Sequence, residues 1–383
     1  MLDNDVLEAM VNSVAKFARE ELVPAEAEVE ETDQIPPQII ERFKEFGFFG
    51  MSIPEEYGGL GLTMFEEASV VMELGFAAPA FRSYFGTSNG VGTHGILIDG
   101  TEEQRQMYLP KIAAGDMVAS FALTEPDAGS DVASLATRAV RDGHDYIING
   151  TKRFITNAPH AGVFTVFART GPAEMRSKGI SAFLVPGGTP GLNVATHFQK
   201  MGFRGSHSSD VTFEDCRVPA SALLGGQEGV GFRTAMTTLD HARLHMSAMA
   251  TGLSIRLVEE GLNYAMDRKQ FGKAIAQFQL IQGMLADCET EALASRAMVE
   301  KVSRMKDAGK IVTKETASCK YFTTEALGRI ADKVLQIHGG YGYIKEYPIE
   351  RLYRDARLLR IYEGTSQIQQ IVIAGQMIKQ AAG

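Results

Sequence analysis

The spacing of apolar residues changes twice along this chain, and these two changes constrain the fold more than any single motif does. In residues 1–117 and again in residues 229–383, apolar side chains recur at helical intervals. In residues 118–228, short β-prone runs alternate with glycine and proline turns. The order of these segments predicts a mainly helical α+β protein, with an N-terminal helical domain, a central small β-barrel or sandwich and a C-terminal helical domain.

Local signals place individual helices in the N-terminal segment. One apolar helix face is formed by Val6, Met10, Val14 and Phe17. The pair Pro36-Pro37 predicts the start of a second helix, and Gly47 predicts its end. Thr63 and Glu66 have the spacing of a capping box, which predicts the start of a third helix.

The central segment contains one strong hairpin signal. Asn149-Gly150 stands between two β-prone runs, and an Asn-Gly pair in that position favours a two-residue turn. Further short strands are predicted at 163–168, 180–185 and 211–213. Several short strands separated by turns favour a small barrel or sandwich.

Long helical patterns fill the C-terminal segment. They lie near 232–267, 279–307 and 313–338, and Thr365 can cap a final helix over 366–380. Helices joined by short connections predict an antiparallel four-helix bundle.

Composition argues against several classes of function. With 45% hydrophobic and 22% charged residues, the chain is typical of a globular protein, and its 383 residues suffice for two or three domains. A net charge of −9 argues against a nucleic-acid partner. No apolar run reaches the ~18 residues of a membrane span, so no membrane association is expected. The acidic N-terminus lacks the pattern of a targeting peptide, and the cysteines fit buried thiols, so we expect a cytoplasmic protein with free Cys216, Cys288 and Cys319.

One carboxylate near the C-terminus is a candidate catalytic base. Residues 360–369 read RIYEGTSQIQ, so Glu363 ends an apolar, arginine-rich stretch just before Gly364, which permits a turn. A glutamate fixed between two helices among apolar neighbours would have a pKa raised toward the range of a general base. The alternative interpretation is a capping or solvated carboxylate.

Four further segments combine small and polar residues in a way that suits a bound cofactor. The loop 121–131, FALTEPDAGSD, offers hydroxyl and backbone N–H donors to a phosphate or to the polar edge of a ring. It matches neither a P-loop nor the dinucleotide fingerprint of a βαβ unit. The other segments are 153–157 (RFITN), 268–272 (RKQFG) with Gln279, and 336–342 (QIHGGYG). Each also has an ordinary interpretation as a turn, a surface salt bridge or a helix C-cap.

Taken together and in this order, the segments resemble the acyl-CoA dehydrogenase family. The resemblance rests on the T-E-P-x-A-G-S-D loop, the F-I-T-N strand, R-K-Q-F-G, Q-x-H-G-G-x-G-Y and I-Y-E-G-T-S-Q-I-Q, and it extends from about residue 5 to residue 380. It implies FAD as the cofactor, an acyl-CoA substrate and electron-transfer flavoprotein as the electron acceptor. It also implies a homo-oligomer, usually a tetramer, and the α–β–α domain order that the apolar spacing indicates.

The resemblance also implies roles for individual residues. Contacts with flavin or pyrophosphate are implied for Phe121, Leu123, Thr124, Gly129 and Ser130, and contacts with the isoalloxazine ring for Phe154 and Thr156. The pyrophosphate and adenosine half, often held across a subunit boundary, is implied for Arg268, Phe271, Gln279, Gln336, Gly339 and Gly340. Thr365 and Gln367 would complete the cofactor site. Substrate contacts are implied for Ser130, Asp240, Arg243 and Gly364.

Glu363 matches the catalytic base of the family. The resemblance therefore implies α,β-dehydrogenation of an acyl-CoA thioester to the trans-2-enoyl-CoA, with Glu363 removing the α-proton and the β-hydride passing to the flavin. A minority of the family carries its base on the helix after the β domain, immediately before an arginine. Ala242 stands at that position here, so the sequence offers only Glu363.

Two histidines on one helical pattern raise the question of a metal. His241 and His245 are four residues apart, which is the spacing of a metal pair. The Glu of H-E-x-x-H is missing and no third ligand is evident. We therefore interpret them as ordinary helix residues and expect no metal.

An arginine in the segment 80–86 (AFRSYFG) bears on the choice of acyl group. A buried arginine beside an acyl chain is costly unless it meets a counter-charge. The Arg82-Ser83 pair is similar to the segment with which glutaryl-CoA dehydrogenases grip the distal carboxylate of their substrate. An alternative function is therefore a glutaryl-CoA-type dehydrogenase, with or without decarboxylation, that acts on a dicarboxylyl-CoA gripped by Arg82.

The competing interpretation of Arg82 is a side chain that reaches solvent or pairs with Glu73 or Glu67. Two departures weaken a full glutaryl-CoA assignment: Gly86 lacks the hydroxyl found there in that subfamily, and Gly75 replaces an acidic residue. Relatives on the same fold that decarboxylate, desulfinate or reduce oxygen directly, and a catalytically silent flavin-binding scaffold, are further alternatives.

Overall fold

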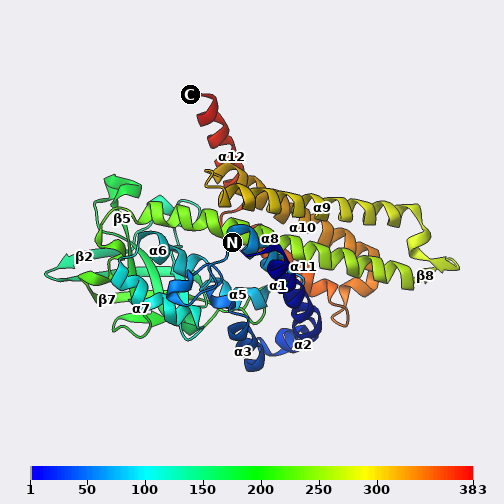
Figure 1. Cartoon of the computed structure of the whole chain (residues 1–383), viewed down its shortest axis with the longest axis horizontal. Helices are drawn as coiled ribbons and strands as arrows, with labels where there is room; N and C mark the ends of the chain where they lie inside the picture. The colour runs from blue at the N-terminus through cyan, green and yellow to red at the C-terminus, as the bar shows by residue number, and fades with distance from the viewer. Residues whose placement is uncertain (1, 383) are drawn as a thin grey trace.

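The computed structural model describes residues 2–382. A group of helices at the N-terminus precedes a β domain, and long helices follow it, as Figure 1 shows. This arrangement confirms the predicted mainly helical α+β fold. Within residues 2–382, the helices are too short or too polar to cross a membrane. The three cysteines are buried and free within the same residues.

The N-terminal helices begin where the local signals predict. They are α1 (Asn4–Phe17), α2 (Val23–Thr32), α3 (Pro37–Glu45), α4 (Met64–Leu74), α5 (Pro79–Gly86), α6 (Val91–Asp99) and α7 (Glu102–Ala113). Pro36 precedes α3, and Gly47 follows it in the left-handed region with a φ of 70°. Thr63 caps α4 in a reciprocal capping box with Glu66. The sequence signals thus fix three helix termini in this region.

The β domain is a single curled sheet. Its strands are β1 (Val118–Ala122), β2 (Arg138–Asp142), β3 (Asp145–Thr156), β4 (Ala161–Arg169), β5 (Ile180–Pro186), β6 (Leu192–Val194) and β7 (Ser208–Pro219). The strand order is β1-β4-β2-β3-β7-β6, and β5 pairs with β4. β1 and β4 are parallel, whereas β3 and β7 form a long antiparallel pair. Apolar side chains of β3, β4, β5 and β7 form the core of this domain.

The predicted hairpin at Asn149-Gly150 is wrong. Strand β3 runs through both residues, and the turn lies earlier, between Asp142 and Asp145. Gly150 has a φ of 147° at an irregularity in the pairing of β3 with β7, and a Cβ there would lie 2.4 Å from Thr137 Oγ1. The glycine is therefore required by a β-bulge and a close neighbour, which a sequence cannot distinguish from a turn.

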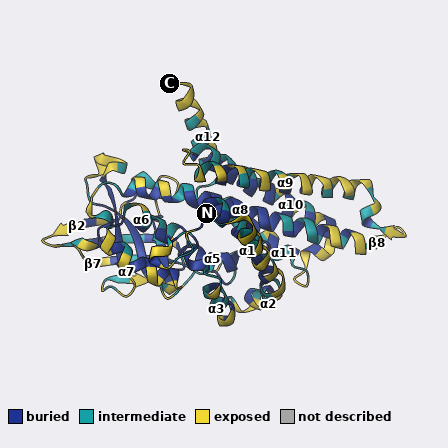
Figure 2. Ribbon diagram, viewed as in Figure 1, coloured by how far each residue is buried: buried dark blue, intermediate teal, exposed yellow. Residues whose placement is uncertain are grey.

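The C-terminal helices follow the predicted periodicity closely. They are α8 (Gly231–Asp267), α9 (Gln279–Asp307), α10 (Thr313–His338), α11 (Ile349–Leu358) and α12 (Ser366–Ala381), with the short strands β8 (Lys269–Gln270) and β9 (Lys273–Ala274) after α8. Helix α8 packs against α4, α9 and α10, and Figure 2 shows its middle deeply buried. Helix α12 projects away from the body and is largely exposed (Figures 1 and 2).

Helices α4 and α8 approach closely because both carry glycine at the contact. A Cβ on Gly252 would lie 2.0 Å from the Met72 carbonyl oxygen, and one on Gly75 would lie 2.6 Å from the Met249 carbonyl oxygen. Neither position has room for a side chain. A larger residue at position 75 is therefore excluded by helix packing.

Candidate active site

Glu363 lies in the short connection between α11 and α12, where side chains of three helices hold the backbone of residues 363 and 364. Its carbonyl accepts from Arg243 Nε on α8 at 3.4 Å and from Gln369 Nε2 on α12 at 3.1 Å. The next carbonyl, that of Gly364, accepts from Lys320 Nζ on α10 at 2.8 Å. Thr365 caps α12 by accepting from the Ile368 N–H, as predicted. The connection is therefore fixed by three of the C-terminal helices.

The backbone of Glu363 is strained. Its φ of 55° lies in the left-handed region, which costs a non-glycine residue on the order of 1–3 kcal/mol. Gly364 follows with a φ of 88°, which only glycine adopts easily. Strain of this kind persists where the surroundings impose it, and it is concentrated at functional sites. Here it directs the carboxylate toward the interior of the protein.

The carboxyl group of Glu363 is buried among cations. Burial raises its pKa above the ordinary glutamate value, and the charges of Arg82, Arg243 and Lys320 oppose the rise. Its Oε2 atom is buried and finds no hydrogen-bond partner within the described chain. A buried acceptor without a partner is costly unless a ligand supplies one. A raised pKa and an unpaired buried oxygen are properties of a general base in an active site.

Glu363 borders a cavity of about 480 Å³ between the β domain and the C-terminal helices. The cavity also collects most of the residues that the sequence placed at the flavin and substrate: Phe121, Leu123, Thr124, Gly129, Ser130, Phe154, Thr156, Arg243, Gly364, Thr365, Arg82 and Ser83. Two more buried polar atoms on its wall, Arg82 Nε and Tyr362 OH, have no partner among residues 2–382. The cavity thus presents unsatisfied donors and an unsatisfied acceptor to whatever fills it.

Phe154 reaches the cavity because β3 is irregular at that point. The pairing of β3 with β7 shifts between Lys152 and Ile155, and Phe154 adopts a φ of 60°. Its ring is 59% exposed, packs against Phe198 with 5.2 Å between the ring centroids, and has the Arg153 guanidinium 5.3 Å from its centroid. A bulge that turns a large apolar ring outward re-aims a side chain, and the exposed ring fits a planar cofactor.

A buried ion pair that the sequence analysis did not single out supports the loop 121–131. Lys152 Nζ lies 2.8 Å from Glu125 Oε1 and donates to the Leu123 carbonyl at 3.1 Å. Glu125 also accepts from the backbone N–H groups of Ala136 and Thr137. Burial lowers the pKa of Lys152 to about 8, and Glu125 opposes that effect. The pair fixes the backbone of the residues that face the cavity.

Arg82 lies on α5, is only 7% exposed and contacts a histidine. Arg82 Nη2 lies 2.8 Å from His245 Nδ1, and His245 Nε2 lies 2.8 Å from Glu67 Oε2. The guanidinium also folds over its own helix, because a Cβ on Gly86 would lie 2.6 Å from Arg82 Nη1. Glu67, one of the predicted partners of Arg82, is therefore separated from it by the His245 ring. Gly86 provides the space that the Arg82 guanidinium occupies.

Glu67, His241 and His245 come together in the interior. A third possible metal ligand therefore does lie beside the two histidines, although the sequence showed none. The Nδ1 atoms of both rings are nevertheless already occupied by hydrogen bonds. Lys306 Nζ lies 2.9 Å from His241 Nδ1, and Arg82 lies against His245 Nδ1. Because both cations are donors, each Nδ1 accepts and each ring carries its proton on Nε2, toward Glu67. Burial lowers the pKa of His241 and of His245, so both rings stay neutral and serve as bridges between Glu67 and the two cations.

The remaining predicted residues lie elsewhere. A second cavity, of about 1010 Å³, is lined by Arg268, Phe271, Gln279, Gly339 and Gly340 at the far end of α8, near the β8 label in Figure 1. Gln336 and Gln367 are exposed and border neither cavity. Asp240 stands behind Arg243, with Oδ1 at 2.6 Å from Arg243 Nη1, and does not line the first cavity.

The two cavities are widely separated within one chain. Arg243 borders the first and Arg268 the second, and the helix between them extends roughly 35–40 Å at about 1.5 Å per residue. Phe271 in the second cavity is 94% exposed with a φ of 51°. An apolar ring so exposed beside a large cavity marks a surface that suits a partner or ligand.

Comparisons with known proteins agree along nearly the whole chain. Residues 4–116, 120–216 and 229–378 match family models described as the N-terminal, middle and C-terminal domains of acyl-CoA dehydrogenase. Acryloyl-CoA reductase (NADH) of Anaerotignum propionicum is 42% identical over 373 residues, which covers 97% of this chain and 94% of that protein. Subunit CarC of the caffeyl-CoA reductase-Etf complex of Acetobacterium woodii is 40% identical over 372 residues, with coverage of 97% and 98%. The structure of butyryl-CoA dehydrogenase from Megasphaera elsdenii matches with a TM-score of 0.94 and 32% identity, covering 99% of both chains.

Proposed function

Since the chain belongs to the acyl-CoA dehydrogenase family of oxidoreductases acting on CH–CH groups, we propose that it dehydrogenates an acyl-CoA thioester to the trans-2-enoyl-CoA. The observation that carries the proposal is the buried Oε2 of Glu363 on the wall of the 480 Å³ cavity, which has no hydrogen-bond partner among residues 2–382. In this role Glu363 removes the α-proton of the thioester. Its strained, triply anchored backbone keeps the carboxylate in place for that transfer.

The residues around the cavity fit FAD. The exposed ring of Phe154 and the hydroxyls of Thr124, Ser130 and Thr156 offer the stacking surface and donors that a flavin needs. When bound, FAD would supply the acceptor for the hydride that leaves the β-carbon. The chain itself binds the thioester, orients its α-carbon toward Glu363 and excludes water from a pocket that is already largely apolar.

We further propose that two copies of the chain complete one cofactor site. The second cavity carries the predicted pyrophosphate and adenosine contacts, yet it lies a long helix away from Glu363 in the same chain. A homo-oligomer, as the family resemblance implies, would bring the second cavity of one protomer to the first cavity of its partner. Electron-transfer flavoprotein would be the electron acceptor, in keeping with the Etf complex named for the Acetobacterium woodii relative.

A site of this kind could oxidise an acyl-CoA or reduce an enoyl-CoA, and the Anaerotignum propionicum relative is named as a reductase. In the reverse direction the same Glu363 carboxyl would deliver a proton to the α-carbon, since a group that is a base one way is an acid the other way. We propose that this protein works in the direction of acyl-CoA oxidation, with butyryl-CoA as the reference substrate.

An alternative substrate class is a dicarboxylyl-CoA. Arg82 lines the cavity with a charged group that is buried, and its Nε has no partner in the described part of the chain. A carboxylate at the distal end of the acyl group would satisfy that donor through a charge-assisted hydrogen bond. Ser83, which also lines the cavity, could add a second donor.

The test is anaerobic mixing of the purified protein with a panel of linear, branched and dicarboxylic acyl-CoAs. We expect a yellow protein whose flavin bleaches as one equivalent of enoyl-CoA forms. Product analysis under air and under nitrogen separates plain dehydrogenation from decarboxylation and from direct oxygen reduction. A protein that stays colourless after FAD is supplied, or that bleaches with no member of the panel, would overturn the proposal.

A further inference from the structure

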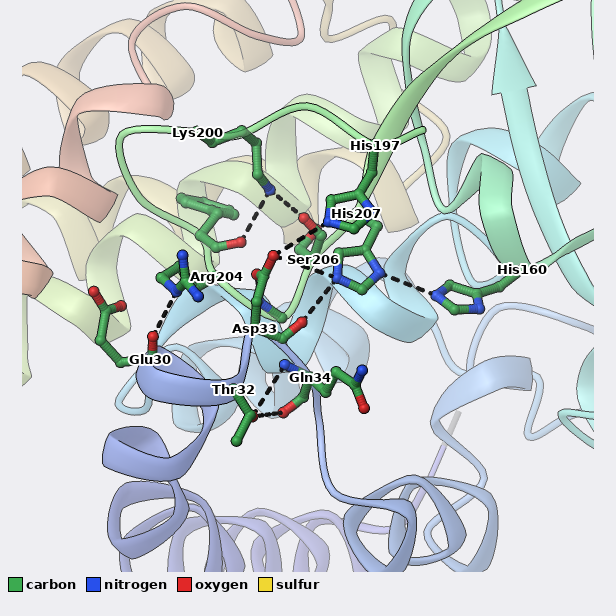
Figure 3. Close-up of polar contacts among 12 residues, drawn as sticks. Glu30, Thr32, Asp33, Gln34, His160, His197, Lys200, Arg204, Ser206 and His207 are labelled. Carbon is green, nitrogen blue, oxygen red and sulfur yellow. Dashed lines mark hydrogen bonds and ion pairs between the residues drawn. The ribbon is translucent and has the colours of Figure 1, made fainter. Parts of the chain in front are cut away.

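Three histidines and an aspartate meet at the junction of the N-terminal helices and the β domain, away from the cavities described above. Figure 3 shows the rings of His197 and His207 turned toward Asp33, with His160 behind His207. His197 Nε2 lies 3.4 Å from Asp33 Oδ2, and His207 Nε2 lies 3.7 Å from the same oxygen. His197 and His207 belong to one loop, whereas Asp33 is far from both in the sequence, so the fold alone brings the aspartate to the two histidines.

The spacing of these atoms matches that of metal ligands. Ligands about 2.0–2.1 Å from a tetrahedral cation lie roughly 3.3 Å from one another. The two nitrogens and the oxygen are all within 4.8 Å of one another. The two imidazoles stack, with ring centroids 4.2 Å apart and 22° between the ring planes, and both Nε2 atoms lie within 3.7 Å of Asp33 Oδ2. Small side-chain rotations would bring the three atoms around one cation.

Asp33 is built to offer one free oxygen. It follows α2 with a φ of 58°, and its Oδ1 accepts from the Gly205 N–H at 2.8 Å. That contact fixes the carboxylate and leaves Oδ2 facing the two rings. Aspartate tolerates this left-handed conformation better than most residues, so the position costs little.

In the cation-free protein His207 Nε2 donates to a backbone carbonyl, so a cation bound there replaces that hydrogen bond. His207 Nε2 lies 2.8 Å from the Asp33 carbonyl oxygen, and His207 Nδ1 lies 3.3 Å from His160 Nε2. With a cation on Nε2, the proton of His207 would move to Nδ1 and be donated to His160. Metal-binding histidines usually donate their other N–H in this way. The arrangement therefore allows both the cation-free and the cation-bound tautomer.

The cations nearby are tied to other acceptors. Lys200 Nζ donates to the carbonyls of Phe203 and Ser206, and Arg204 Nε donates to the Glu30 carbonyl. The contrast with Glu67, His241 and His245 is clear, because there the Nδ1 atoms contact a lysine and an arginine. The Asp33 cluster is also partly open, with side-chain exposures of 31% for His197 and 13% for His207, so an ion can enter.

We propose that Asp33, His197 and His207 bind a divalent transition-metal cation, with water in the fourth position. Two imidazoles and one carboxylate suit Zn²⁺. Bound there, the cation fastens the loop 195–207 to the end of α2. The same loop reaches the cavity wall, because the His207 carbonyl accepts from the Asn157 N–H at 2.7 Å and Ser208 Oγ lies 3.4 Å from Thr156 Oγ1. The cation therefore stabilises the wall beside the active site and takes no part in the reaction.

The test uses tag-free, flavin-loaded, full-length protein that has been stripped with a chelator. Equilibrium dialysis against Zn²⁺ followed by elemental analysis should give one ion per chain, and Co²⁺ should develop the visible absorption of a tetrahedral complex. Scanning calorimetry should show a midpoint raised by several degrees with Zn²⁺. The matched variants are Asp33→Asn and His197→Gln, each of which should lose the ion and the shift. His144→Gln, which changes an exposed histidine in the β2–β3 turn, should keep both.

The variants also keep the proposal falsifiable if one of them folds poorly. The amide oxygen introduced by Asp33→Asn can still accept from the Gly205 N–H, and His197→Gln leaves Asp33 unchanged. The two independent variants must therefore both lose the ion and the midpoint shift. Substoichiometric Zn²⁺ in the native protein, or a stoichiometry and midpoint shift unchanged in both variants, would overturn the proposal.

Discussion

Arg82 and His245 lie 2.8 Å apart through Nη2 and Nδ1, although 163 residues separate them in the sequence. This contact connects the 480 Å³ cavity beside Glu363 with a buried carboxylate, because His245 in turn faces Glu67. The neutral His245 ring thus links the buried Arg82 guanidinium to the Glu67 carboxylate, which supplies the counter-charge that a buried cation requires. The charge of Arg82 is thereby retained in the cavity wall, where it influences the Glu363 carboxyl.

Glu363→Gln should abolish turnover while leaving the fold intact. The amide has the shape of the acid but cannot remove a proton, so kcat should fall by at least about 10²–10⁴-fold. Flavin content and the thermal midpoint should stay close to those of the wild type. Steady-state assays with butyryl-CoA measure the loss, and Glu346→Gln, at an exposed position, is the matched control. A variant that works at the wild-type rate would remove Glu363 from the mechanism.

The acid limb of the pH–rate profile should report the Glu363 carboxyl. Burial raises its pKa and Arg82 opposes the rise, so the base becomes protonated and kcat/KM falls as the pH decreases through that raised value. Replacing Arg82 with Gln removes an opposing charge, so the limb should move to higher pH. Profiles of both proteins with butyryl-CoA test this, and a limb that moves to lower pH would contradict the electrostatic role of Arg82.

Arg82→Ala should change the preference between glutaryl-CoA and butyryl-CoA. A hydrogen bond to a charged group contributes about 1.5–3 kcal/mol. The ratio of kcat/KM for glutaryl-CoA over butyryl-CoA should therefore fall on the order of 10–100-fold if Arg82 binds a distal carboxylate. Because both substrates report on the same variant, a general loss of activity cancels in the ratio. An unchanged ratio would show that Arg82 does not recognise the acyl terminus.

Glu67→Gln should destabilise the fold strongly. Burial opposes ionisation of Glu67, but the Nε2–H groups of His245 and His241 that face it hold its pKa below the usual range, so the carboxylate is charged in the native state. Its stabilisation is present above the ordinary glutamate pKa and is lost as the pH falls below it. Without it Arg82 and Lys306 lack a counter-charge, and breaking a buried pair costs about 3–5 kcal/mol.

Thermal unfolding of Glu67→Gln is best compared with that of Glu73→Gln on the same helix. Glu73 is only half-buried and faces no histidine, so its replacement should change the free energy of unfolding by less than about 1 kcal/mol. Equal midpoints for the two variants would mean that the Glu67 network does not stabilise the interior.

The sequence predicts those parts of the fold that local chemistry determines. The limits of α9 and α10 follow from apolar spacing, and Thr365 and Thr63 cap helices because their side chains reach N–H groups three residues on. The Asn149-Gly150 signal failed because a bulge and a turn demand the same glycine.

Contacts between distant segments could not be predicted in the same way. Glu67 is one of the partners that the sequence suggests for Arg82, but nothing in the sequence indicates that His245 stands between them or that Gly86 makes room for the guanidinium. The same holds for the meeting of Asp33 with His197 and His207, since each histidine alone is typical of an exposed loop. Only the three-dimensional packing identifies these clusters. The roles of the individual cofactor contacts stay predictions.

A last prediction concerns Asp355 on α11, whose Oδ1 accepts from the Phe203 N–H at 2.6 Å. Burial raises the pKa of this carboxyl to about 7, against opposition from that hydrogen bond and from Arg354. In the unfolded chain the pKa is about 3.9. Between these two values the native state holds a proton that the unfolded state has lost, so the free energy of unfolding declines as the pH rises through this window.

Asp355→Asn should remove that decline. The amide oxygen can still accept from Phe203, and no charge has to be buried at neutral or higher pH. The variant should therefore match the wild type near pH 5 and unfold at a higher temperature near pH 8.5, whereas Asp332→Asn, at an exposed position, should change neither midpoint. Thermal unfolding at the two pH values decides the matter. A variant less stable than the wild type at the higher pH would mean that Asp355 is ionised in the native protein and that its charge is stabilised there.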